Sequence, residues 1–477
     1  MTDLASYSAT DLIRGFKVRE FSPVEVLDAV LERIDRVNPI LNAFVLVDPD
    51  RARTTARASE HRWARGEPIG LVDGIPASVK DQSLTEGWPT RKGSRTVNAE
   101  GPWTEDAPVV ARLKEQGAVL VGKTTTPEYG WKAVTDSPLS GISRNPWDPT
   151  RTCGGSSGGA AIAAAAGMGA LHQGSDGGGS IRIPAAFCGV FGLKPTFGRV
   201  PMYPQGYGSM AQLGHYGPIT RTVADAALMM TVMARSDSRD WLALQAEKRT
   251  YLDGLDEGIA GLKIAYSPTL GYAKVDAEVA EVVAEAALHF EQLGAVVEEA
   301  TPKIENPLHC FLTFYESGLA SSLASLSEAE LEMLDPGLRE MAERGRRVTA
   351  GQLFSAWQER ERLARTINEF YEHFDLLITP QVSVTAFETG TLHPPHLSSM
   401  WDWIPFAFPF NLTHQPAAAM PCGFASDGLP VSFQIVAPRH ADRRVLRASR
   451  AYERVRPIVL PDVIKQSSAR VEAEGRL

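Results

Sequence analysis

Cysteines, basic clusters and long runs of bulky apolar residues are all scarce in this sequence. Four cysteines occur among 477 residues, far apart and without a CxxC spacing, which argues against a disulfide scaffold or a zinc knuckle and favours a reducing compartment. Lys+Arg 48 against Asp+Glu 57 gives a net charge of −9, which argues against binding to nucleic acid or to an anionic membrane surface. The first 30 residues hold no apolar core of a secretory signal, so we expect a cytoplasmic protein without a membrane partner.

One uncharged stretch, residues 152–175, is long enough to span a bilayer. Its residues are mostly Ala, Gly and Ser, and only Ile162, Met168 and Leu171 are both bulky and apolar. This composition predicts a tightly packed helix between two glycine-rich loops instead of a membrane span.

Helix and strand patterns alternate along the chain. Ser22, Pro23 and Glu25 form a helix-start signature, and the apolar pattern that follows stops before Pro39. Further along, the patterns predict a helix at 107–116, a strand at 118–121, a strand at 261–266, a helix at 276–293 and a strand at 295–297. This alternation predicts an α/β architecture whose strands are buried on both faces.

Two segments near the C-terminus lack such patterns. Residues 401–410 combine aromatic residues with prolines, which forbid a regular helix or a central strand and predict a rigid apolar loop. Residues 462–477 are polar and charged without periodicity, and we expect them to fray.

Glycine and serine concentrate at residues 154–159 and 174–182, inside a segment, 151–198, that holds 13 of the 41 glycines. Glycine allows backbone amides to converge on one point, as binding of a phosphate or of an oxyanion requires. A phosphate loop needs a lysine after its second glycine, and no lysine lies between Lys132 and Lys194. The dinucleotide motif GxGxxG is also incomplete, so the pattern disfavours nucleotide binding.

Residues 154–158 match the GxSxG motif of hydrolases with a Ser-His-Asp triad. That motif needs an apolar strand directly before it, whereas residues 145–151 form a loop with two prolines. No SxxK sequence occurs either. The pattern therefore argues against both of these nucleophile arrangements.

Other candidate groups have ordinary structural explanations. His393 and His396 flank two prolines, which would break the helix that a metal motif requires, so we expect no metal and no cofactor. We expect His172 to pack in the core and Cys153 to be a buried structural thiol.

The longest motifs are specific. Residues 151–159, 174–189 and 192–196 resemble the signature of the amidase signature family, and so do residues 73–81 and 428–436. The resemblance extends over nearly the whole chain. The sequence departs from the family pattern at Cys153, where Pro is frequent, and at Gly177, where a larger residue is usual.

The resemblance implies one large α/β domain with a mixed, mainly parallel twisted sheet and helices on both faces. It divides the chain into an N-terminal helical region at 1–65 that packs on the core, a catalytic domain at 66–461 and a polar tail at 462–477. Within the catalytic domain, residues 73–200 form the signature core, and residues 201–410 form a variable region that shapes the substrate site.

The resemblance also implies a Ser-Ser-Lys triad, with Ser180 as nucleophile, Ser156 as bridging serine and Lys80 as base. A lysine acts as a base near pH 7 only where burial or its neighbours lower its pKa from about 10.4. Ile75 and Val79 make the surroundings of Lys80 apolar, which fits a buried position.

The same resemblance places the oxyanion hole in the loop before the nucleophile. Its donors would be the backbone amides of Gly177, Gly178, Gly179 and Ser180. Asp176 and Arg182 flank the nucleophile and are expected to support the loop by pairing, and Ser157 is expected to be a hydrogen-bonding loop residue.

Aromatic residues outside the signature are expected to line the substrate pocket, and they suit apolar or aryl groups. The candidates are Tyr129, Tyr207, Trp401, Trp403 and Phe406. We therefore expect a stand-alone hydrolase, monomeric or homodimeric, that cleaves C–N bonds of small aryl or alkyl amides, and also carbamates (urethanes) and esters.

Three alternatives stay open. Within the family, the chain could be the glutamine-hydrolysing A subunit of an aminoacyl-tRNA amidotransferase, although residues 334–360 do not resemble the charged motif of that subunit. Outside this reading, it could be a non-catalytic binding module or an esterase with a histidine triad. Intact triad positions argue against the binding module.

Overall fold

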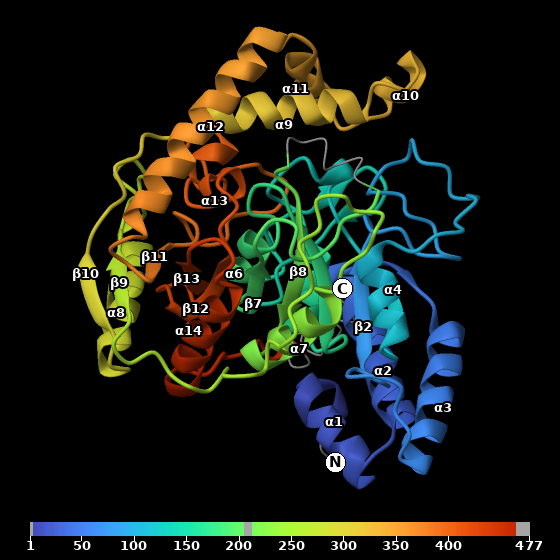
Figure 1. Ribbon diagram of the computed structural model, residues 1–477. Coiled ribbons are helices and arrows are strands. Elements are labelled where there is room, and N and C mark those ends of the chain that lie inside the picture. Colours follow the sequence, from blue (N-terminus) through green and yellow to red (C-terminus); the bar gives the residue numbers. More distant parts are fainter. Residues whose placement is uncertain (1–2, 205–211, 464–477) are drawn as a thin grey trace, which may run out of the picture.

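An 11-stranded mixed sheet runs through the centre of the molecule (Figure 1). The computed structural model describes residues 3–204 and 212–463. The strands follow one another across the sheet in the order β1-β3-β2-β6-β8-β7-β12-β13-β11-β9-β10. Their bounds are β1 (Phe44–Val47), β2 (Pro76–Lys80), β3 (Val119–Thr124), β6 (Leu171–Asp176), β7 (Phe191–Lys194), β8 (His215–Thr220), β9 (Lys263–Tyr266), β10 (Val296–Glu299), β11 (Leu376–Pro380), β12 (Ala417–Phe424) and β13 (Pro430–Val436). A separate two-stranded sheet joins β4 (Asp136–Ser137) and β5 (Gly141–Ile142).

Strand direction differs between the middle and the two ends of the large sheet. The neighbours β3, β2 and β6 are parallel, and so are β11, β9 and β10. The strands between these groups pair antiparallel, as does β1 at the edge. The α/β fold with a mixed sheet is confirmed, whereas its antiparallel middle is a detail that the sequence patterns did not reveal.

Helices cover both faces of this sheet. Alternate residues of β3 belong to different hydrophobic clusters. Leu120 belongs to the cluster that includes residues of α1, α4, α7, α8 and α14, whereas Val119 and Val121 belong to the cluster that includes residues of α2, α5 and α6. The helices are α1 (Ala9–Val18), α2 (Pro23–Leu41), α3 (Pro49–Arg65), α4 (Pro108–Glu115), α5 (Gly158–Ala165), α6 (Arg182–Cys188), α7 (Val223–Met233), α8 (Ala277–Gln292), α9 (Leu308–Ser322), α10 (Glu328–Glu332), α11 (Pro336–Arg346), α12 (Ala350–Phe370), α13 (Pro409–Leu412) and α14 (Asp442–Val455). Short 3-10 helices span Leu4–Ser6, Glu128–Gly130 and Met400–Asp402.

A group of helices lies apart from the two layers that cover the sheet. Figure 1 shows α9, α10, α11 and α12 together at the top of the molecule, beyond one end of the strands. Helix α9 packs on α11 and α12, and a third hydrophobic cluster joins this group to residues 382–412. All of these segments belong to the second half of the chain. The helices that lie beyond the strand ends therefore come from that half.

Several predicted elements occur where the sequence placed them. Ser22 and Glu25 form the predicted capping box of α2. That helix continues through Pro39 to Leu41, three residues beyond the predicted end, and the Asn42 amide closes its last turn by donating to Asn38 O from a left-handed conformation. Residues 401–410 are mostly irregular, but they include the end of a 3-10 helix and the start of α13.

The uncharged stretch at 152–175 folds as a short buried helix followed by a strand. Helix α5 has only 8 residues, all of them buried, and β6 starts at Leu171. Across residues 3–204 and 212–463, no helix combines the length and the apolar character that a membrane span requires.

Candidate active site

Lys80 is the last residue of β2, and its side chain is fully buried. Because β2 and β6 are parallel neighbours, their carboxyl ends meet at the same edge of the sheet, which brings Lys80 beside Ser175. Lys80 Nζ lies 2.7 Å from Ser156 Oγ and 3.0 Å from the hydroxyl oxygens of both Ser157 and Ser175. Burial lowers the pKa of Lys80 well below its ordinary value, and the opposing charge of Asp176 offsets only part of this effect.

The loop before α5 supplies two of these serines. Ser156 and Ser157 are both almost completely buried, and the peptide bond between Gly155 and Ser156 is cis. Gly130 lies so close that a Cβ atom there would be 3.2 Å from Ser156 Oγ and 2.4 Å from Gln82 Nε2. Gly130 therefore packs directly against Ser156, and a larger residue at position 130 would collide with Gln82.

The hydroxyl protons of Ser157 and Ser175 are already used. Ser157 Oγ donates to Ser175 O, and Ser175 Oγ donates to Gln82 Oε1, each at 3.0 Å. The Ser175 amide in turn donates to Ser157 Oγ. Both hydroxyl oxygens therefore face Lys80 as hydrogen-bond acceptors.

Ser180 lies at the end of the glycine loop and is half-buried. Its carbonyl oxygen accepts a hydrogen bond from the Ser157 amide, which ties the two serine loops together. Ser180 and Ser156 line the same cavity, and this places the predicted nucleophile and the predicted bridging serine side by side.

The amides of the glycine loop do not all have the same surroundings. The Gly179 amide donates to Asp176 Oδ1 at 2.7 Å, so it is engaged within the loop. The amides of Gly177, Gly178 and Ser180 have no hydrogen-bond acceptor among the described residues. The predicted set of oxyanion donors is thereby reduced to these three amides. An Asp three residues before an amide is a turn signal that could have indicated this.

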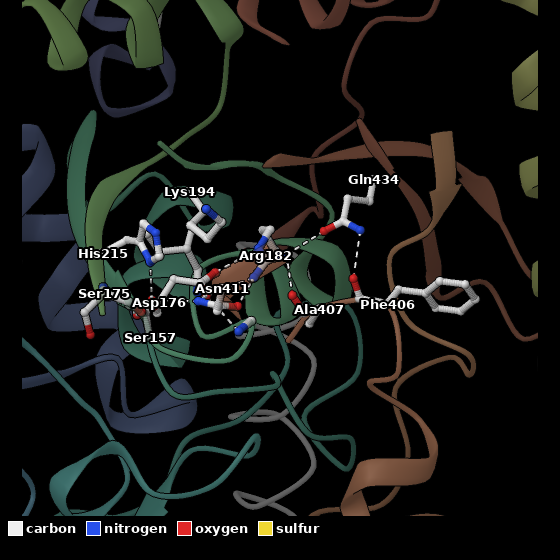
Figure 2. Close-up of polar contacts among 12 residues, drawn as sticks. Ser157, Ser175, Asp176, Arg182, Lys194, His215, Phe406, Ala407, Asn411 and Gln434 are labelled. Atoms are coloured by element: carbon white, nitrogen blue, oxygen red, sulfur yellow. Dashed lines mark hydrogen bonds and ion pairs between the residues drawn. The ribbon is translucent and has the colours of Figure 1, made fainter. Parts of the chain in front are cut away.

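Asp176 and Arg182 flank the glycine loop at 177–180 and form a buried ion pair (Figure 2). Arg182 donates two hydrogen bonds to Asp176, and its remaining N–H groups reach Ala407 O, Asn411 Oδ1 and Gln434 Oε1. Burial by itself would raise the pKa of Asp176, but the charge and hydrogen bonds of Arg182 hold that pKa below its usual range. Asp176 is therefore ionised, and Arg182 links it to Ala407, Asn411 and Gln434.

Asn411 and Gln434 are parts of this network that the sequence reasoning missed. The Asn411 amide donates to Asp176 Oδ1 and to two carbonyl oxygens, and Gln434 Nε2 donates to Phe406 O. Gln434 lies in the recognised motif at 428–436, whereas Asn411 has no local signal, because its role arises only from contacts with residues more than 190 positions earlier.

Two cavities meet at Ser180. The first, which we call the serine cavity, contains Ser156 and Ser180 and is lined by Gln82, Tyr129, Gly130, Ser175, Asp176, Gly177, Met202, Gly214, Tyr216 and Tyr315. The second, the inner pocket, also includes Ser180 and is lined by Trp131, Lys132, Ala133, Gly178, Ile183, Phe311, Tyr315, Met400, Trp401 and Ile404. The few charged side chains at these walls are paired, since Lys132 contacts Asp136 and Asp335.

The predicted pocket residues divide between these cavities and the core. Tyr129 lines the serine cavity and Trp401 lines the inner pocket. Trp403 and Phe406 are completely buried: Trp403 stacks on Phe187, and Phe406 packs in a separate core cluster. Their prediction as pocket residues is therefore wrong, and both are core residues. The turn at 400–402 places Trp401 at the inner pocket, whereas Trp403 follows the turn and packs in the core. Tyr207 lies outside the described residues.

Histidine and cysteine side chains near the site have structural surroundings. Burial lowers the pKa of His172 to about 3, and its Nδ1 contacts Ser78 Oγ. His215 lies under the nucleophile loop with Nδ1 facing Asp176 O and Leu213 O. Burial raises the pKa of the Cys153 thiol to about 12, which disfavours a thiolate. In the described part of the chain, no cluster of His, Cys, Asp and Glu could hold a metal ion.

Comparisons with known proteins show which family the chain resembles. The family model described as Amidase matches residues 25–446. An acylamidase of Rhodococcus erythropolis is 37% identical over 458 residues, covering 94% of this chain and 95% of that protein. The A subunit of the glutamyl-tRNA(Gln) amidotransferase of Gloeobacter violaceus is 36% identical over 460 residues, covering 91% and 94%.

Solved structures show the same similarity. The crystal structure of a bacterial aryl acylamidase of the amidase signature enzymes matches with a TM-score of 0.89 and 30% identity, covering 94% of this chain and 96% of that one. The structure of a 6-aminohexanoate cyclic dimer hydrolase also has a TM-score of 0.89, at 29% identity, covering 97% and 100%. The chain therefore belongs to the amidase signature family, and it is a hydrolase that acts on C–N bonds of amides.

Proposed function

We propose that this protein hydrolyses aryl and alkyl amides, and also carbamates and esters, through an acyl-enzyme on Ser180. The observation that carries the proposal is the contact of fully buried Lys80 with Ser156 Oγ at 2.7 Å. A buried lysine whose pKa is lowered in this way is neutral at the pH where a solvated lysine is charged, so it can accept a proton.

The hydrogen-bond inventory around Lys80 supports the direction of proton transfer. A neutral amine has two N–H donors and one lone pair. The oxygens of Ser157 and Ser175 accept the two N–H groups, because the protons of both hydroxyls are donated elsewhere. The lone pair is left for the hydroxyl of Ser156, which is the proton that the base must remove.

The reaction begins with attack of Ser180 Oγ on the substrate carbonyl carbon. Ser156 takes the proton of Ser180 while it gives its own proton to Lys80. The C–N bond then breaks, and the departing nitrogen receives a proton from Ser156, which regains one from Lys80. Water attacks the resulting ester by the same proton route and releases the carboxylic acid.

The free amides of the glycine loop would stabilise the oxyanion of each tetrahedral intermediate. Gly177, Gly178 and Ser180 offer these donors, and the engaged amide of Gly179 fixes the loop through Asp176. Removal of one important donor of this kind costs about 3 to 4 kcal/mol of transition-state stabilisation.

The walls of both cavities favour an apolar or aryl substrate over free glutamine. Glutamine would bring a charged ammonium group and a carboxylate, which need unpaired charged partners. The charged side chains at the cavity walls, Lys132 and Asp176, are already paired. Glutamine hydrolysis as part of an amidotransferase is the second candidate, and the similarity to A subunits of that enzyme favours it.

A turnover panel on the purified chain tests the proposal. The panel holds acetanilide, a primary amide, an aryl carbamate, a p-nitrophenyl ester and glutamine, with Ser180→Ala as the inactive control. We expect anilide hydrolysis to dominate and a sulfonyl fluoride to label Ser180. Dominant glutamine hydrolysis would reverse the choice of substrate, and full activity of Ser180→Ala would overturn the mechanism.

A further inference from the structure

Trp401 lines the inner pocket and also a larger cavity, of which Ser180 is not a lining residue. The inner pocket has a volume of about 20 Å³. The larger one, which we call the outer cavity, has a volume of about 330 Å³ and is lined by Tyr272, Ala273, Leu308, Trp401 and Pro405, with Lys274 and His396 among its polar residues. Since Trp401 lines both, we take it as the wall between them.

Two features hold the indole of Trp401 in this position: contacts with aromatic rings of α9 and a short turn of the backbone. Its ring lies edge-on to Phe311, with 5.6 Å between centroids, and edge-on to Tyr315 at 6.1 Å. Phe311 also stacks on Tyr315. The next residue, Asp402, accepts hydrogen bonds from the amides of Ser398 and Ser399, which fixes the turn that carries Trp401.

Proton transfer assigns the two sides of Ser180 to different parts of the substrate, and this step rests on the proposed function. Ser156 must protonate the departing nitrogen, and Ser156 lines the serine cavity but not the inner pocket. The leaving amine therefore occupies the serine cavity. The acyl group points the other way, into the inner pocket and toward Trp401.

We propose that Trp401 limits the length of the acyl group and that the outer cavity is a second acyl subsite behind it. A volume of about 20 Å³ holds one or two water molecules, which matches the methyl group of an acetyl amide. A straight alkyl chain of six to eight carbons extends past this wall and enters the outer cavity only when the indole is displaced or removed. The enzyme with Trp401 in place selects short acyl groups.

The test is a series of N-acyl-p-nitroanilides with acetyl, butyryl, hexanoyl and octanoyl groups, all with the same leaving amine. In the wild type, kcat/KM falls at least about 10-fold from acetyl to hexanoyl. In Trp401→Ala, the ratio of hexanoyl to acetyl kcat/KM rises at least about 10-fold. Trp241→Ala, which removes a surface indole that is 77% exposed, leaves the ratio unchanged.

A second variant tests the outer cavity itself. Ala273→Phe added to Trp401→Ala fills that cavity and lowers the ratio of hexanoyl to acetyl kcat/KM again. Trp401→Leu serves where the alanine variant fails to fold.

The outcomes separate this inference from the proposed function. A wild type that prefers hexanoyl to acetyl overturns the inference alone, and so does an unchanged chain-length profile in both Trp401 variants. A wild type that cleaves no acyl anilide overturns the proposed function and the inference together.

Discussion

Lys80 and Lys123 lie on the neighbouring parallel strands β2 and β3, and both side chains are fully buried, yet their contacts differ. Lys123 Nζ lies 3.3 Å from a carboxylate oxygen of Asp81 and donates to the carbonyl oxygens of Ser83 and Pro89. Lys80 Nζ contacts three serine hydroxyl groups and, among the described residues, no carboxylate within ion-pair distance.

The contacts decide what burial does to each amine. Burial lowers the pKa of Lys123 only to about 8, because the charge and hydrogen bond of Asp81 favour the ammonium form and offset part of the effect of burial. Burial lowers the pKa of Lys80 well below its ordinary value, since hydroxyl groups carry no charge and Asp176 acts only from a distance. Two lysines of equal burial thus differ in their contacts, one as an ion-pair partner and the other as the proposed base.

Of the variants that test this comparison, Lys80→Met is expected to have the largest effect on activity. Loss of the base lowers kcat by about 10²- to 10⁴-fold. The unfolding free energy changes little, because the amine carries little charge and the hydroxyls of Ser157 and Ser175 keep their own acceptors. Anilide turnover and chemical denaturation of the same preparation measure both effects. Retention of more than a tenth of the wild-type kcat would remove Lys80 from the mechanism.

Lys123→Met reverses this pattern. It leaves the buried carboxylate of Asp81 without its cation, which costs about 3 to 5 kcal/mol of unfolding free energy, while kcat per folded molecule stays within a few-fold. Burial already raises the pKa of Asp81, and loss of Lys123 raises it further. The folded variant then binds more protons than the unfolded chain above the ordinary pKa of Asp, so its stability falls as pH rises through this window.

Urea denaturation of Lys123→Met at several pH values measures this effect, and Asp81→Asn in the same chain is the control. The double variant removes the unpaired charge, so we expect it to recover most of the lost stability and its pH dependence. A single variant as stable as the wild type would show that the ion pair contributes nothing, and the comparison with Lys80 would fail.

Local patterns predicted much of the fold because capping and strand burial act over a few residues. The capping box at Ser22 and Glu25 is formed, and the helix predicted at 276–293 is α8. The order of the strands could not be predicted in this way. Strands β7 and β12 are neighbours although more than 200 residues separate them, and no local pattern records that pairing.

The site shows the same division. Long motifs predicted the roles of Lys80, Ser156 and Ser180, and the parallel pairing of β2 and β6 explains why Lys80 lies beside the serine loops. Phe311 and Tyr315 lie on α9, whose sequence reads as an ordinary apolar helix, and only packing brings them to Ser180. Trp403 is the same residue type as Trp401 and lies in the same aromatic segment, but it faces the core. Composition alone does not record the direction in which a side chain points.

Ser175→Ala gives the smallest expected effect and tests the contacts of Lys80 most directly. The variant removes one hydrogen-bond acceptor of Lys80 Nζ but keeps the base and the nucleophile. A charged ammonium loses more from this change than a neutral amine, because hydrogen bonds to charged groups are about twice as strong. The pKa of Lys80 therefore falls further below its ordinary value.

The neutral amine is the active form, so kcat/KM falls on the acid side of this pKa. In Ser175→Ala, that acid limb moves by about 0.5 to 1 unit to lower pH, while kcat at the plateau falls by less than about 10-fold. The exposed Ser355→Ala serves as the matched control and leaves the limb in place. A limb that moves to higher pH would mean that Ser175 raises the energy of the ammonium form. Ser157 and Ser175 could then not be treated as neutral acceptors that leave Lys80 a base.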